Sequence, residues 1–149
     1  MGDSSQPAFL KKVFSSDLWR PSSSRPKALI TGAALEGSSK DILDVLVGKG
    51  FEVFLSDIAA GKDVNLVWDL ENKPEDRFLS SFDLVVSCSV LEHIRRPHLA
   101  CQHLLDVLKT GGLMYCLFHG FGAIINILMI TIVFMQAPLI IYVKTRPCA

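Results

Sequence analysis

Two aspartates and a glycine-containing segment have the types and spacing of a nucleoside site. Residues 32–37, Gly-Ala-Ala-Leu-Glu-Gly, follow a short apolar run, and glycine there lets the backbone approach a ligand. Asp57 lies 25 residues beyond Gly32, about where nucleoside-binding α/β domains place the carboxylate that accepts hydrogen bonds from ribose hydroxyls. Asp69 follows a third run and could bind an adenine amino group. For both aspartates the alternative is a carboxylate that caps a turn.

The histidines and cysteines do not predict a metal site. His93, His98 and His103 are spaced by five, which turns successive side chains roughly 140° apart around a helix, so they do not share a face. The four cysteines include no C-x-x-C pair, and no apolar signal region precedes them, so reduced thiols are expected rather than a disulfide framework.

Short β-branched runs alternate with helical patterns, which predicts a parallel sheet with helices on both faces. In such sheets ligands bind beyond the carboxyl ends of the strands. A site should therefore lie in the loops after Thr31, Asp57, Trp68 and Cys88. Strands are expected at residues 27–31, 51–57, 65–68, 82–88 and 113–118, with one helix from Ser38 to Gly50 and another from Pro97 to the Gly111-Gly112 pair.

The most specific stretch is Phe-Asp-Leu-Val-Val-Ser-Cys-Ser-Val-Leu-Glu-His at residues 82–93, followed by Pro97 and Val-Leu-Lys-Thr-Gly-Gly at 107–112. This stretch resembles the second half of the class I S-adenosylmethionine-dependent methyltransferases, and the resemblance extends more loosely over residues 27–118. It implies a Rossmann-like, mostly parallel sheet, S-adenosylmethionine as cofactor, and methyl transfer to a small-molecule or protein acceptor. The sheet would lack its usual C-terminal half or have an apolar segment in its place.

The resemblance also implies a set of site residues. His93 would act as a base where the acceptor carries a proton, although a histidine that pins the loop before Pro97 is the alternative. The family's acidic-x-G-x-G-x-G loop is altered, because Ile30 stands at the acidic position and Ala34 and Glu36 at glycine positions. These changes could weaken cofactor binding by about 1–3 kcal/mol. The implied cofactor-binding residues are Gly32, Ala33, Ala34, Gly37, Asp57, Asp69, Leu70, Ser87, Cys88 and Ser89.

The loop also resembles the T-G-A-A-x-x-G opening of short-chain reductases. That second match ends at the loop, because no Tyr-x-x-x-Lys pair follows it. Methyltransferase ancestry is therefore favoured. A non-catalytic remnant of the family, acting as a membrane-tethered or partner-binding module, is the alternative function.

Composition divides the chain into a leader at 1–26, a domain at 27–118 and a tail at 119–149. The whole chain balances 15 basic against 15 acidic residues, which argues against a nucleic-acid binder. The Ser/Pro-rich leader is expected to be flexible, with a few apolar residues docking as a short helix.

Residues 110–143, which include most of the tail, form a run of 34 without a single Asp, Glu, Lys or Arg. A helix over residues 120–143 would be roughly 36 Å long, enough to cross a bilayer, so a membrane helix that anchors the chain from the cytoplasmic side is the favoured interpretation. The alternative is a pair of buried strands broken near residues 136–138 that replaces the missing half of the sheet. A truncated or alternatively spliced product, whose tail has no selected fold, is a third interpretation.

Overall fold

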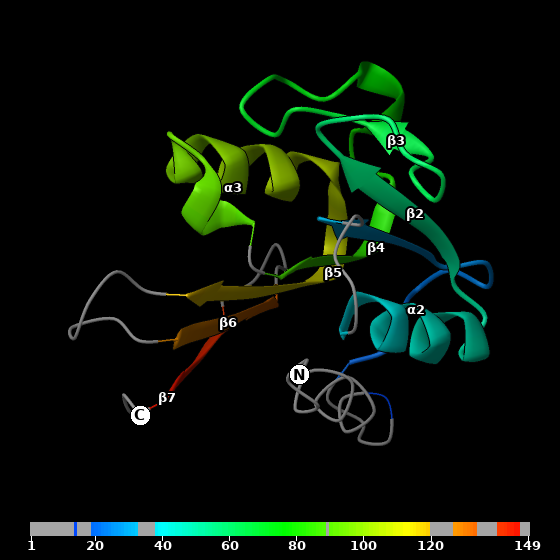
Figure 1. Ribbon diagram of the computed structural model, residues 1–149. Helices are drawn as coiled ribbons and strands as arrows, with labels where there is room; N and C mark the ends of the chain where they lie inside the picture. Colours follow the sequence, from blue (N-terminus) through cyan, green and yellow to red (C-terminus); the bar gives the residue numbers. More distant parts are fainter. Residues whose placement is uncertain are drawn as a thin grey trace.

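The computed structural model describes residues 14, 19–32, 38–88, 90–119, 127–133 and 140–146 of the chain. They form a single seven-stranded sheet with the strand order β3-β2-β1-β4-β5-β6-β7 (Figure 1). The elements are β1 (Lys27–Thr31), α2 (Ser38–Gly48), β2 (Glu52–Asp57), β3 (Leu66–Val67), the 3-10 turn η1 (Asp76–Phe78), β4 (Phe82–Cys88), the 3-10 turn η2 (Leu91–His93), α3 (Pro97–Val107), β5 (Leu108–His119), β6 (Ile127–Val133) and β7 (Ile140–Arg146).

The first five strands are parallel, as the alternation of apolar runs and helical patterns predicts. Helix α2 lies against one face of this part of the sheet and α3 lies against the other (Figure 1). Strands covered on both faces read as continuous apolar runs, which is why Ala28-Leu29-Ile30 and Leu84-Val85-Val86 carry no polar residue. Ala28 and Ile30 belong to the core on the α2 side, whereas Leu29 belongs to the core on the α3 side.

Strand β5 begins earlier than the sequence predicts. Helix α3 ends at Val107, and β5 starts at Leu108 rather than at Leu113. The register with β4 shifts between Phe82, which pairs with Leu108, and Leu84, which pairs with Leu113. Gly111 in this irregular stretch has φ 82, a conformation that favours glycine. The two glycines therefore shape a bulge within the strand instead of separating it from the helix.

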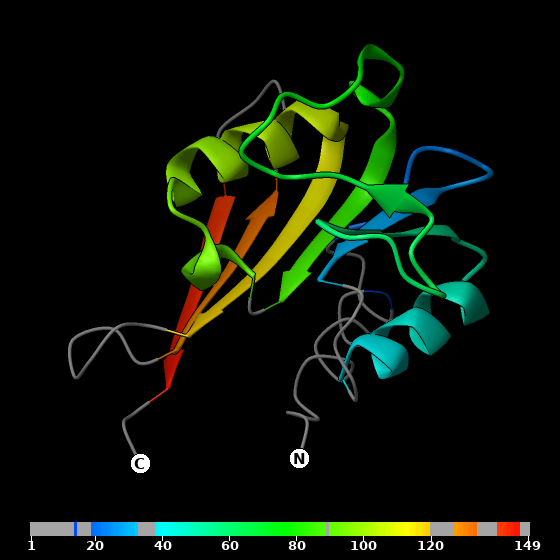
Figure 2. The same cartoon turned by 45° about the horizontal axis from the view of Figure 1, so that its top comes forward.

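The tail continues the sheet. Strand β6 pairs antiparallel with β5, from Leu113 opposite Val133 to His119 opposite Ile127, and β7 pairs antiparallel with β6 (Figure 2). The favoured prediction of a membrane helix over residues 120–143 is therefore wrong, and the alternative of two strands is confirmed for residues 127–133 and 140–146. Within the described part of the chain, no helix combines the length and apolar character that a membrane crossing needs.

The physical reason is that uniform apolarity does not distinguish a membrane helix from a buried strand. The segments 127–133 and 140–146 are rich in isoleucine and valine, whose branched side chains favour strands. The outer edge of β5 also offers a row of backbone N–H and C=O groups with which another strand can pair. Gln136, Ala137 and Pro138, the predicted break, lie between β6 and β7 outside the described residues.

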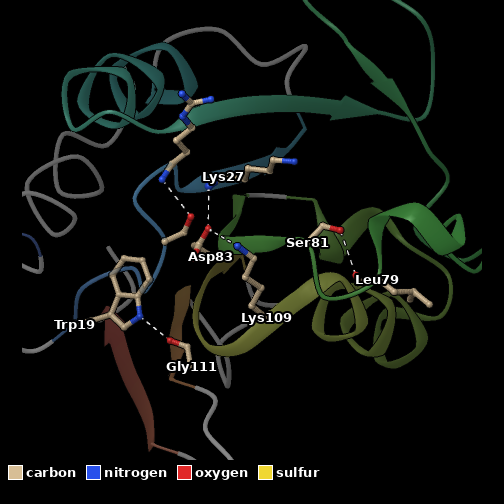
Figure 3. Close-up of polar contacts among 9 residues, drawn as sticks. Trp19, Lys27, Leu79, Ser81, Asp83, Lys109 and Gly111 are labelled. Carbon is tan, nitrogen blue, oxygen red and sulfur yellow. Dashed lines mark hydrogen bonds and ion pairs between the residues drawn. The ribbon is translucent and has the colours of Figure 1, made fainter.

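The segment before β1 is anchored to the α2 side of the core. The indole of Trp19 is only 6% exposed and donates a hydrogen bond from Nε1 to the carbonyl oxygen of Gly111 at 2.9 Å (Figure 3). Its ring stacks on Phe51 with 6.5 Å between the ring centroids, and the ring of Phe14 lies 5.6 Å from that of Phe51. Two aromatic residues of the predicted leader thus contribute to the core of the domain.

Candidate functional site

Three hydroxyl side chains form a row across the carboxyl ends of the parallel strands. Thr31 at the end of β1 is in register with Ser56 of β2 on one side and with Ser87 of β4 on the other. All three residues are 1–2% exposed. Thr31 lies two residues after Leu29, and residues two apart in a strand point to the same face of the sheet. Because Leu29 belongs to the α3-side core, the row lies on the sheet face that α3 covers.

Two of these hydroxyls are not hydrogen-bonded within the described residues. Oγ1 of Thr31 and Oγ of Ser87 are both buried and without a partner there. A buried hydroxyl with no partner costs about 1–3 kcal/mol, so such groups are normally paired with protein, water or a ligand. The sequence prediction included Ser87 and missed Thr31 and Ser56, although a hydroxyl as the last or penultimate residue of an apolar strand was the available signal.

The chain leaves β1 through a left-handed turn at Gly32. Its φ is 80, and its N–H donates to the carbonyl oxygen of Ser56 at 3.0 Å, so the turn is held against β2. Ala33, Ala34 and Gly37, which were predicted to contact the cofactor, lie outside the described residues, as does Glu36. Ile30, at the position where the family carries an acid, is 1% exposed and packs in the α2-side core.

Asp57 is the last residue of β2 and lies on the same edge of the sheet as Thr31 and Ser87. One carboxylate oxygen, Oδ1, accepts a hydrogen bond from the N–H of Ile58 at 2.7 Å, and the backbone carbonyl accepts one from Trp68 at 2.8 Å. The side chain is half-buried. The carboxylate therefore caps a turn, as the alternative interpretation of Asp57 expects. It also lies at the carboxyl end of β2, which is the position that ribose binding requires.

Asp69 and Leu70 form a tight turn after β3. Oδ1 of Asp69 accepts a hydrogen bond from the N–H of Glu71 at 3.0 Å, and its carbonyl accepts one from Asn72 at 2.9 Å. Leu70 is 5% exposed, so its side chain is part of the core rather than a wall of an open site. Its carbonyl oxygen lies 2.7 Å from Nδ1 of His103 on α3, a contact that the sequence does not reveal.

The segment after β4 carries the remaining predicted residues. Cys88 ends β4, and Ser89 lies outside the described residues. His93 ends the turn η2, is exposed, and donates its backbone N–H to the carbonyl oxygen of Val90 at 3.0 Å. Leu91, which is 1% exposed, anchors the turn in the core. His93 thus follows β4 by one short turn at the edge of the sheet that carries Asp57 and Asp69.

The opposite end of the sheet, where the parallel strands begin, carries other charged residues. Asp83 near the start of β4 is 2% exposed, and its Oδ2 accepts hydrogen bonds from the N–H of Lys27 at 3.0 Å and from Nζ of Lys109 at 3.2 Å (Figure 3). Two open hollows of about 540 and 290 Å³ border Asp106 and Leu108 near this edge. Neither is lined by a predicted site residue, so these two hollows and the candidate site do not coincide.

Comparison with known proteins identifies the domain. Residues 43–116 match the family described as a methyltransferase domain. A likeness of fold extends to the CMeT domain of the citrinin polyketide synthase, with TM-score 0.62, 15% identity, and coverage of 74% of this chain and 33% of that one. The CurJ carbon methyltransferase gives TM-score 0.63, 19% identity, and coverage of 77% and 35%.

The methyltransferase CalH, solved in complex with SAH, gives TM-score 0.53, 15% identity, and coverage of 62% and 32%. This chain therefore spans about a third of the length of these solved structures, and at such identities the likeness concerns the fold alone. No curated protein matches the sequence.

Proposed function

Because this chain belongs to the class I methyltransferases, we propose that it binds S-adenosylmethionine along the carboxyl ends of β1, β2, β3 and β4 and transfers the methyl group to a small-molecule or protein acceptor. In open α/β sheets this edge is where ligands bind. The proposal places the ligand at the end of the sheet that carries Asp57, Asp69 and His93, away from the hollows beside Asp106.

The buried hydroxyls of Thr31 and Ser87, which have no hydrogen-bond partner among the described residues, carry the proposal. Both are buried on adjacent strands, in register, at the one edge where a cofactor of this family is expected. Valine and alanine would fill the same space without the cost of a buried hydroxyl that lacks a hydrogen bond. The two hydroxyls are therefore suited to hydrogen-bond a polar group that enters from the loops above them, and the polar amino-acid end of the cofactor is such a group.

Asp57 and Asp69 would hold the nucleoside end. Oδ1 of Asp57 accepts a hydrogen bond from the adjacent N–H of Ile58, and because a carboxylate can accept several hydrogen bonds, Asp57 would also accept those of the two ribose hydroxyls. Asp69 has the same arrangement, with one oxygen fixed by the N–H of Glu71, so its carboxylate is oriented before a ligand arrives. Such preorganisation lowers the entropy cost of binding.

S-adenosylmethionine, when bound, supplies a methyl group on a sulfonium centre that is reactive without further activation. The residues of this chain contribute chiefly by holding the donor and by excluding misaligned approaches. His93, at the surface of the short turn after β4, would accept a proton from an acceptor that must lose one. With an acceptor that is already a free nucleophile, His93 would be dispensable for the reaction.

Calorimetric titration of the full chain with SAH tests the proposal. Asp57→Ala should weaken binding by about ten- to a hundredfold, because the lost hydrogen bonds involve a charged group. Asp76→Ala, which removes an exposed carboxylate in η1, is the matched control and should bind as the wild type does.

Thr31→Val gives the sharper result, because affinity and stability should move in opposite directions. It should weaken SAH binding about tenfold while raising the melting temperature of the ligand-free protein, since it removes a buried hydroxyl that has no partner in the described part of the chain. Wild-type protein that binds no SAH at millimolar concentration would refute the proposal and favour a non-catalytic module. A Thr31→Val variant that loses stability but keeps its affinity would refute the role of the hydroxyl row.

A further inference from the structure

The turn that carries Asp69 is attached to α3 by two side-chain contacts. Nδ1 of His103 lies 2.7 Å from the carbonyl oxygen of Leu70, and both groups are buried. Nε of Arg96, the residue at the N-cap position of α3, lies 3.0 Å from Oε1 of Glu71. These residues are far apart in the sequence, with 33 positions between Leu70 and His103 and 25 between Glu71 and Arg96.

The His103 contact has a defined chemistry. A carbonyl oxygen only accepts hydrogen bonds, so Nδ1 must carry the proton and donate it. His103 occupies the buried stripe of α3 together with Ala100, Leu104 and Val107, where an apolar side chain would be ordinary. An imidazole at this position packs no better than leucine, and what it adds is the hydrogen bond to the turn.

The turn itself is internally rigid. Two backbone N–H groups, of Glu71 and Asn72, bond to the carboxylate and the carbonyl of Asp69, and Nε1 of Trp68 donates to the carbonyl of Asn72 at 2.9 Å. The turn can therefore move as a unit unless contacts with the rest of the protein fix its position. The contacts from α3 do so at the two residues that follow Asp69, Leu70 and Glu71.

We infer that His103 is a positioning residue for cofactor binding, which fixes the Asp69 turn against α3 so that the carboxylate of Asp69 faces the adenine position; Arg96, paired with Glu71, assists it. The inference rests on the proposed function. Arg96 also lies only three positions after His93 in the sequence, so the same helix start joins the adenine-side turn to the segment expected to meet the acceptor. The contribution of Arg96 is smaller, because its side chain is 58% exposed and such ion pairs are screened by solvent.

Two substitutions of His103 separate positioning from packing. In His103→Asn the side-chain amide is attached at the same carbon as Nδ1 and can still donate to Leu70, whereas His103→Leu fills the space and leaves the carbonyl unpaired. We expect His103→Leu to weaken binding of both SAH and adenosine by about tenfold, and His103→Asn to recover most of this loss. Arg96→Gln, an exposed change that leaves the core intact, should weaken binding about twofold at low salt and not measurably at high salt.

Hydrogen exchange provides a readout that does not depend on a ligand. The amide protons of Glu71 and Asn72 should exchange at least fivefold faster in His103→Leu than in the wild type or in His103→Asn. If exchange changes as expected but wild type and variants bind SAH equally, the positioning role is refuted and the proposed function stands. If the wild type itself binds no SAH, the proposed function fails and the positioning role fails with it. Unchanged exchange in both His103→Leu and Arg96→Gln would refute the attachment itself.

Discussion

Replacing Asp83 tests how the two ends of the sheet divide stability and function. Its carboxylate is 2% exposed and accepts hydrogen bonds from the backbone N–H of Lys27 and from the ammonium of Lys109, whose side chain is 32% exposed (Figure 3). In Asp83→Ala the part-buried N–H of Lys27 loses a charged acceptor, which costs about 2 kcal/mol. The ammonium of Lys109 can turn to solvent, so its lost ion pair adds only about 1 kcal/mol.

The expected loss in the free energy of unfolding is therefore about 3 kcal/mol for Asp83→Ala. Asp83→Asn keeps an oxygen that can accept from Lys27 and gives up only the charge opposite Lys109, so it should cost about 1 kcal/mol. Urea unfolding followed by the fluorescence of Trp19 and Trp68 measures both values, provided that the dependence on urea concentration is unchanged.

Two results would contradict this reasoning. The first is a loss below 1 kcal/mol for Asp83→Ala, which would mean that the Lys27 N–H finds another acceptor. The second is an equal loss for the alanine and asparagine variants, which would assign the whole effect to the charge. Because Asp83 lies at the opposite edge from the candidate site, SAH affinity should change less than twofold in the Asp83→Asn variant.

The remaining predictions concern the segment before β1 and the reactivity of α3. Trp19→Ala should lower the free energy of unfolding by about 4 kcal/mol and Trp19→Phe by about 2 kcal/mol, because phenylalanine keeps the contact with Phe51 and loses the hydrogen bond to Gly111. Thermal unfolding measures both values. Equal and small losses of stability in the two variants would mean that residue 19 does not belong to the domain. Burial raises the pKa of the Cys101 thiol, so its thiolate fraction at pH 8 is lower than that of an ordinary cysteine. Alkylation of Cys101 by iodoacetamide, followed by mass spectrometry, should be slower in the folded protein than alkylation of a short cysteine peptide. In urea, the rate for Cys101 should rise to that of the peptide. Faster alkylation in the folded protein would contradict the burial argument.

Several features of the fold follow from local sequence. The apolar runs at residues 27–31 and 82–88 are bounded by residues that end strands, and both runs form strands with those bounds. The pattern at residues 38–48 has a helical period and stops just before Gly50, whose φ of 84 ends the turn. Alternation of these elements was enough to predict the parallel order and hence the edge at which a site should lie.

The ends of strands were less predictable than their existence. The Gly111-Gly112 pair reads as a helix stop, but the structure ends α3 at Val107 and places both glycines inside β5. A β-carbon on Gly112 would lie 2.8 Å from the backbone carbonyl oxygen of Lys109, which cannot move aside as a side chain can, so a close contact within the bulge requires glycine at this position. The bulge itself lies where the pairing with β4 shifts between Phe82 and Leu84, and no short window of sequence contains that pairing.

By itself, the sequence determined the parallel half of the sheet, the family and the strand ends that carry Asp57 and Asp69, because these depend on periodicity and on residues close together in the chain. Tertiary structure decided the rest. The apolar tail became strands rather than a helix because β5 offered it a backbone edge to pair with. Likewise, the bond from His103 to Leu70 exists only where distant segments meet, and the same holds for the burial of the Thr31 hydroxyl, which has no hydrogen-bond partner among the residues that the structure describes. Hydrogen bonding depends on which groups come into contact and not on the neighbouring residues in the sequence.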